Sequence, residues 1–68
     1  MIAINHHLIL RSSDLTNWWS LIDRYTGRRI VYAGHDEAAL CLHTTMNQRM
    51  DAGMTFDEAY FNALREAS

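Results

Sequence analysis

Residues 18–34 read WWSLIDRYTGRRIVYAG, and this stretch predicts a β-hairpin. Asp23 can accept backbone hydrogen bonds where the turn begins. Gly27, four residues later, supplies the left-handed conformation with which the chain enters the second strand. The flanking Trp, Leu, Ile, Val and Tyr residues are good strand formers. With residues 24–27 as the loop, Asp23 is expected to face Arg28 across the hairpin.

This register divides the hairpin into two faces, because successive side chains of a strand point in opposite directions. The first face is apolar and is expected to face the core; its cross-strand pairs are Leu21–Ile30 and Trp19–Tyr32. The second face is mixed; its pairs are Ile22–Arg29, Ser20–Val31 and Trp18–Ala33. A slip of one residue would exchange the two faces.

Two helices are expected after the hairpin. Asp36 is the predicted N-cap of the first helix, which runs to about Ala52 and ends at Gly53. Thr55 and Glu58 form a capping box that opens the second helix. The apolar stripe of the first helix holds Ala39, Leu42, Met46, Arg49 and Met50. The apolar face of the second helix holds Phe56, Ala59, Tyr60, Ala63, Leu64 and Ala67.

The residues before the hairpin suggest a further strand. Their β-branched content indicates a strand over residues 7–11 at the hairpin edge, and a short helix fits them nearly as well. Residues 1–68 are therefore expected to form a single small α+β domain: an antiparallel β-hairpin, with two or three strands, followed by two α-helices packed on one face. A core of this size only narrowly outweighs chain entropy, so a homodimer is expected.

Composition limits the class of protein. Hydrophobic residues make up 49% of the chain, which argues against a disordered tail. Cys41 is the only cysteine, so no intramolecular disulfide forms and a reducing compartment is expected. The first residues lack the basic stretch of a secretory signal, and no apolar run approaches a membrane span. We therefore expect a cytoplasmic protein that does not enter a membrane.

The net charge of −2 is unevenly distributed and bears on nucleic-acid binding. Residues 1–35 carry four arginines against two aspartates, whereas the rest of the chain carries two arginines against six carboxylates. Asp57 and Glu58 open the second helix and would repel phosphate, so a helix-turn-helix reader is not expected. The alternative is a small dimeric β-ribbon DNA-binding protein that uses the hairpin arginines Arg24, Arg28 and Arg29.

The sequence predicts neither an enzyme nor a metal or cofactor site. It has no nucleophile elbow, no paired carboxylates on one face and no phosphate-binding glycine loop. His6 and His7 are adjacent, so on a strand their side chains would point to opposite faces. Cys41 and His43 would lie about 200° apart around a helix. Neither spacing matches a closed zinc site.

The adjacent tryptophans indicate a binding surface. If Trp19 faces the core, Trp18 must lie on the second face of the hairpin. There it joins Ile22 and Val31, unless residues 1–10 fold over it. The chain has no lysine, and arginine and tryptophan are enriched at interface hot spots. The hairpin has too few nearby carboxylates to pair all its arginines, so the predicted partner-binding residues are Trp18, Arg24, Tyr25, Arg28 and Arg29.

In length and layout, with a hairpin at residues 18–34 and helices from Asp36 and Thr55, the chain resembles the small proteins that phages make early in infection to disarm host machinery. It is most similar to the quorum-sensing anti-activators, cytosolic dimers that bind a LuxR-type transcriptional activator and keep it off DNA. One of these also binds a type IV pilus assembly ATPase. The resemblance implies an inhibitor of a host transcription regulator, acting in the host cytoplasm. Anti-CRISPR proteins are equally small and are the alternative; a structural dimer subunit is a third class.

Overall fold

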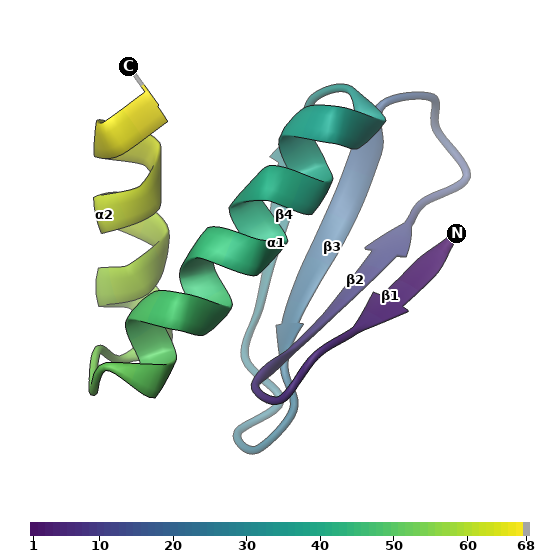
Figure 1. Ribbon diagram of the computed structural model, residues 1–68. Coiled ribbons are helices and arrows are strands. Elements are labelled where there is room, and N and C mark those ends of the chain that lie inside the picture. Colours follow the sequence, from purple (N-terminus) through teal and green to yellow (C-terminus); the bar gives the residue numbers. More distant parts are fainter. Residues whose placement is uncertain (68) are drawn as a thin grey trace.

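The computed structural model describes residues 1–67, without the side chain of residue 67, as a four-stranded antiparallel sheet followed by two helices (Figure 1). The strands lie in the sheet in chain order: β1 (Ile2–Ile4), β2 (Leu8–Ser12), β3 (Trp18–Asp23) and β4 (Arg29–Ala33). The helices are α1 (Asp36–Asp51) and α2 (Phe56–Ala67). The predicted α+β class is confirmed, and the sheet has one strand more than expected.

The β3–β4 hairpin has the predicted register. All five cross-strand pairs are those expected, and the Asp23 N–H donates to the Arg28 carbonyl at 2.8 Å. At the tip, the Asp23 carboxylate accepts a hydrogen bond from the Tyr25 N–H at 2.9 Å, and Gly27 has a φ of 79°. Asp23 and Gly27 therefore have the roles that turn chemistry predicts.

The N-terminal residues extend the sheet and do not cover Trp18. The strand predicted over residues 7–11 is confirmed as β2, which pairs antiparallel with β3. β1 in turn pairs with β2, with Ile4 opposite Ile9. His6 and His7 lie in the loop between β1 and β2. The expectation that these two side chains point to opposite faces of a strand is therefore wrong.

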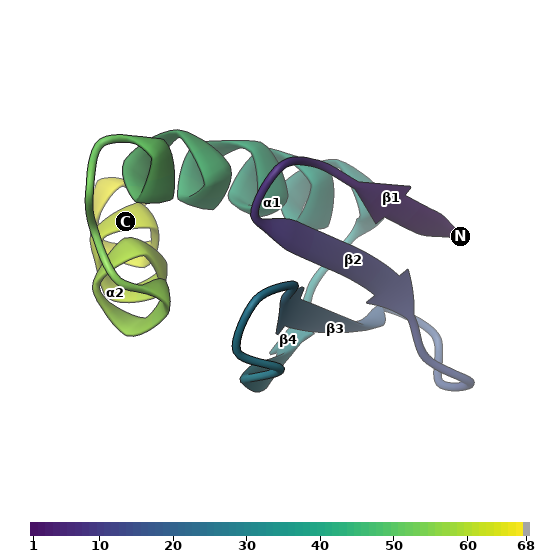
Figure 2. The ribbon, with the colours of Figure 1, turned by 90° about the horizontal axis from the view of Figure 1, so that it is seen from below.

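The core lies between one face of the sheet and the helices. Figures 1 and 2 show α1 crossing this face and α2 packed against α1 on the same side of the sheet. Trp19 is 3% exposed, and its indole Nε1 donates to the Gly34 carbonyl at 2.9 Å. The buried apolar side chains are Leu8, Leu10, Trp19, Leu21, Ala39, Leu42, Met46, Phe56, Ala59 and Ala63. The predicted core face of the hairpin is thus confirmed.

The ends of α1 differ in detail from the prediction. The N-cap is His35 and not Asp36, because the Ala39 N–H already bonds to the His35 carbonyl at 2.9 Å. Asp36 and Glu37 instead occupy the first turn, where carboxylates are favoured by the helix dipole. At the other end Gly53 has a φ of 105°, which confirms the predicted left-handed residue after the helix.

The second helix begins with the predicted capping box. The Thr55 hydroxyl accepts a hydrogen bond from the Glu58 N–H at 3.3 Å, and the Glu58 carboxylate accepts one from the Thr55 N–H at 3.0 Å. The predicted apolar face is confirmed by its buried members, Phe56, Ala59 and Ala63. Within residues 1–67, neither α1 nor α2 is long and apolar enough to cross a membrane.

One polar side chain inside the core was not predicted. His43 of α1 is 5% exposed, and its Nε2 lies 3.1 Å from the Leu8 carbonyl oxygen. Because a carbonyl can only accept, this nitrogen carries the proton and donates. Cys41, two residues earlier, is exposed. His43 therefore joins α1 to β2.

Candidate functional site

The sheet face that points away from the helices is uncovered, and we call it the outer face. The strand register and the alternation of side chains assign to it Ile2, Ile4, Ile9, Arg11, Trp18, Ser20, Ile22, Arg29, Val31 and Ala33. Its exposed large apolar residues are Ile2, Ile4, Trp18 and Val31. Trp18 is 43% exposed, in contrast to its neighbour Trp19. The outer face is thus an apolar surface in contact with solvent.

Two arginines add positive charge to the outer face. Arg11 and Arg29 are exposed, and neither forms an ion pair or side-chain hydrogen bond with another described residue. Both line a shallow hollow on this face, together with the loop residue Asp14. In the strand register Arg29 lies opposite the apolar residue Ile22. The outer face can therefore offer both apolar contact and charged hydrogen-bond donors.

The other two hairpin arginines are paired within the chain. Arg24 donates from Nη1 to the Asn5 carbonyl at 2.9 Å, and Arg28 donates from Nε to the Asp57 carboxylate at 2.6 Å. The sequence predicts that the hairpin arginines cannot all be paired within the chain, and two of the three are paired. Asp57 is distant in sequence, and Arg24 uses a backbone carbonyl. Of the three arginines near the hairpin tip, Arg29 alone has no partner among the described residues.

The five predicted partner-binding residues do not form one surface. Trp18 and Arg29 lie on the outer face. Arg28 points toward the start of α2. Arg24 and the exposed Tyr25 lie at the hairpin tip, beside the loop between β1 and β2. The outer-face pair and the hairpin tip are therefore separate parts of the predicted surface.

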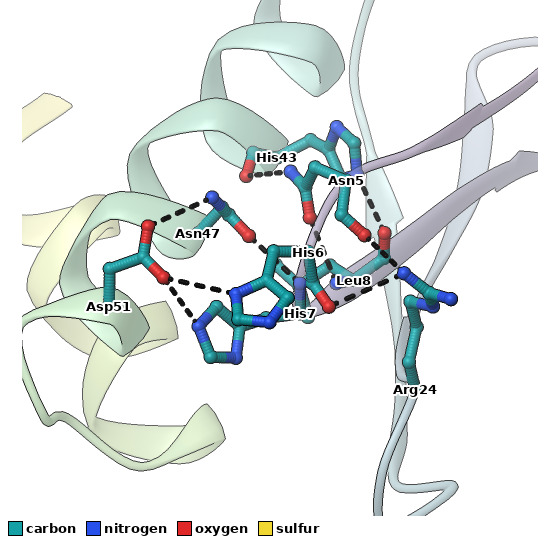
Figure 3. Close-up of polar contacts among 8 residues, drawn as sticks. All are labelled: Asn5, His6, His7, Leu8, Arg24, His43, Asn47 and Asp51. Carbon is teal, nitrogen blue, oxygen red and sulfur yellow. Dashed lines mark hydrogen bonds and ion pairs between the residues drawn. The ribbon is translucent and has the colours of Figure 1, made fainter.

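A polar cluster lies where the β1–β2 loop, the hairpin tip and the C-terminal end of α1 meet (Figure 3). One carboxylate oxygen of Asp51 lies 2.7 Å from His7 Nε2 and 3.4 Å from His6 Nδ1. These hydrogen bonds, first that of His7 and then that of His6, lower the pKa of the Asp51 carboxyl. The ring of Tyr25 lies 6.0 Å from each imidazole, centroid to centroid. We call His6, His7 and Asp51 the histidine cluster.

The histidine cluster could not be found by sequence spacing. Asp51 lies 44 and 45 residues from the two histidines, and neither interval belongs to a local ligand motif. The adjacency of His6 and His7 is the one signal in the sequence, but it indicates a shared site only if the two residues lie in a loop and not on a strand. In a tight loop, adjacent side chains can turn to the same side.

Comparison with known proteins finds no match for this chain. No protein-family model matches the chain, and no curated protein or solved structure is significantly similar to it. The outer face and the histidine cluster are therefore interpreted from their own geometry and chemistry.

Proposed function

We propose that this protein binds another protein through its outer face and inhibits that partner by occluding a functional surface. The observation that carries the proposal is the exposure of Trp18, opposite Ala33 and diagonal to the exposed Val31, on a sheet face that no helix covers. Exposed apolar patches rimmed by polar residues mark interaction sites on soluble domains. Tryptophan and arginine are the side chains most enriched at interface hot spots.

The chemistry of the outer face defines the surface that would fit it. Trp18 and the isoleucines require an apolar area on the partner, because they contribute to affinity only when binding removes them from water. Arg11 and Arg29 require carboxylates near that area, because a guanidinium can bind a carboxylate through two parallel hydrogen bonds. A partner with an apolar centre and an acidic rim satisfies both requirements.

The pairing of Arg24 and Arg28 within the chain favours a protein partner over DNA. Affinity for DNA depends chiefly on cations that reach phosphates. Two of the three arginines expected for a β-ribbon reader already donate to Asn5 and Asp57. The exposed isoleucines on the same sheet have no corresponding role against a phosphate backbone.

The resemblance in size and layout to phage anti-activators makes a LuxR-type transcriptional activator the leading target. In this proposal the protein acts in the cytoplasm of the host cell, and the occupied activator does not reach its promoter. A type IV pilus assembly ATPase is a further target of the same kind. The alternative inhibitory function, against a CRISPR nuclease, would use the same outer face.

A competition gel shift tests the proposal. Increasing amounts of the protein should remove the band that a LuxR-type activator forms with its promoter DNA. The double variant Trp18→Thr and Arg29→Ala should not remove it, and threonine keeps the strand propensity at position 18. Phe61→Gln is the matched control, because Phe61 is an exposed aromatic residue on α2, away from the outer face.

Three results would contradict the proposal in whole or in part. Equal inhibition by the parent and the double variant would show that the outer face is not the binding surface. A sequence-selective, steeply salt-dependent shift of DNA by the protein alone would favour the β-ribbon alternative. No effect on any member of a panel of LuxR-type activators would reject this class of target.

A further inference from the structure

The histidine cluster contains the donor set of a transition-metal site: two imidazole nitrogens and one carboxylate oxygen. A ligand atom from each of the three side chains lies within 4.8 Å of the other two. We propose that His6, His7 and Asp51 bind a divalent transition-metal ion of the class that favours imidazole, such as Zn²⁺. This site is separate from the outer face and does not depend on the proposed function.

The distances within the cluster are close to those that coordination requires. In a tetrahedral zinc site, bonds of about 2.0–2.1 Å place neighbouring ligand atoms roughly 3.3 Å apart. His6 Nδ1 and the Asp51 oxygen are 3.4 Å apart. His7 Nε2 and the same oxygen are 2.7 Å apart, as a hydrogen bond requires. Metal binding would replace the proton between them and separate the pair by roughly half an ångström.

The loop that carries both histidines is held in place by the protein (Figure 3). The backbone N–H of Asn5 donates to the Leu8 carbonyl at 3.0 Å, and the Asn5 side chain accepts from the Leu8 N–H at 2.9 Å. Asn47 of α1 accepts from the His7 N–H at 2.9 Å. The Arg24 guanidinium donates to the Asn5 carbonyl oxygen, and the Arg24 backbone N–H donates to the His7 carbonyl oxygen. Such preorganisation lowers the entropy that binding must otherwise remove.

The position of Asp51 is an independent reason to expect a cation. Asp51 is the last residue of α1, where the helix dipole is negative and a carboxylate is unfavourable. Arg49, the basic residue of this turn, does not compensate it, because its guanidinium pairs with Asn62 and Glu66 on α2. An ion bound at Asp51 would balance both the carboxylate and the helix end.

The openness of the cluster indicates the kind of site. His6 and Asp51 are exposed, whereas the His7 side chain is 18% exposed. Three protein ligands leave at least one coordination position for water or for a group of a partner, as in open zinc sites. Mg²⁺ and Ca²⁺ prefer oxygen ligands and are not expected to bind.

Calorimetric titration with Zn²⁺ tests the site. The protein should carry no histidine tag, and Cys41→Ser should be present throughout, because an exposed thiol can bind Zn²⁺ by itself. We expect one ion per chain. His6→Ala, His7→Ala and Asp51→Asn should each weaken binding by at least about tenfold, since even outer-sphere changes cost that much.

A matched control and a structural readout accompany the titration. His35→Ala removes an exposed histidine at the opposite end of α1 and should leave Zn²⁺ affinity unchanged. In NMR spectra, Zn²⁺ should shift the resonances of the histidine cluster and of Tyr25. His6 is largely exposed, so His6→Ala is decisive even if His7→Ala alters the fold.

Three outcomes would overturn this inference. The absence of saturable Zn²⁺ uptake by the parent would show that the cluster is only a hydrogen-bonded group. Zn²⁺ affinity that is the same in the parent and the three variants would place the ion elsewhere. Equal uptake of Mg²⁺ would indicate attraction to a carboxylate without coordination by imidazole.

Discussion

The guanidinium Nε of Arg28 lies 2.6 Å from a carboxylate oxygen of Asp57 and joins the tip of the β3–β4 hairpin to the first turn of α2. About half of each side chain is exposed, so screening by water limits this pair to about 0–1 kcal/mol of stability. Its consequence is a difference between adjacent arginines. Arg28 is engaged within the chain, whereas Arg29 is available on the outer face.

Single substitutions should therefore separate the two arginines. Arg29→Ala should weaken partner binding by about thirtyfold, equivalent to about 2 kcal/mol, with the melting temperature unchanged. Arg28→Ala should lower the melting temperature by a few degrees at low salt and by less at high salt. Thermal melts at two salt concentrations and the competition gel shift provide the measurements. Loss of binding in Arg28→Ala with full binding in Arg29→Ala would reverse these roles.

The two adjacent tryptophans should also differ in their effect on stability. Substitution of Trp19 should destabilise the fold, whereas substitution of Trp18 should not. Trp19→Ala removes a buried indole and the donor to the Gly34 carbonyl, and should cost about 3–5 kcal/mol of unfolding free energy. Trp18→Thr changes an exposed side chain and should stay within about 0.5 kcal/mol of the parent. Urea denaturation of both variants measures the difference. A strongly destabilised Trp18→Thr variant would mean that Trp18 is covered, by a second chain or by another segment.

The hairpin was predicted in full because its information is local. Asp23 and Gly27 specify the turn, and the alternation of apolar and polar residues then determines which face is buried. The capping box of Thr55 and Glu58 identified the start of α2 for the same reason. These interactions connect residues fewer than six positions apart, where side-chain chemistry and backbone geometry are directly linked.

The features that the sequence did not predict depend on contacts between distant segments. β1 has three residues, and the loop that follows has Asn5 as its single turn-forming residue and no glycine or proline, so only a weak turn signal separates β1 from β2. Arg28 meets Asp57 because α2 begins beside the hairpin tip. His6 and His7 meet Asp51 because the end of α1 reaches the β1–β2 loop. Each pairing follows from the tertiary packing.

The exposed apolar surfaces bear on a prediction of the oligomeric state. Nine large hydrophobic residues are exposed among the described part of the chain, four of them on the outer face. We predict a homodimer, so sedimentation equilibrium at micromolar concentration should give twice the 7.9 kDa mass of the chain. A stable monomer would contradict this. Trp18→Thr should dissociate the dimer if its interface is the outer face, and should leave the dimer intact if the interface lies elsewhere.

Acid should destabilise the protein through two carboxylates. Hydrogen bonds from the backbone N–H and the side chain of Thr55 lower the pKa of Glu58 from its usual 4.5, and His7 and His6 lower that of Asp51 from 3.8. A carboxyl whose pKa is lower in the folded state stabilises the protein above its unfolded pKa. This stabilisation is lost as the pH falls through the folded value.

The melting temperature should therefore fall between about pH 5 and pH 2, and the double variant Asp51→Asn and Glu58→Gln should fall less steeply over this range. Thermal melts at several pH values, at constant ionic strength, measure the two slopes. The single variants show how much of the change in slope comes from Glu58 in the capping box and how much from Asp51 in the histidine cluster. These two groups lie at opposite sides of the turn joining α1 to α2. An unchanged slope in the double variant would show that other carboxylates control acid unfolding. The pKa values of Asp51 and Glu58 would then be the same in the folded and the unfolded protein, and neither group could make stability depend on pH.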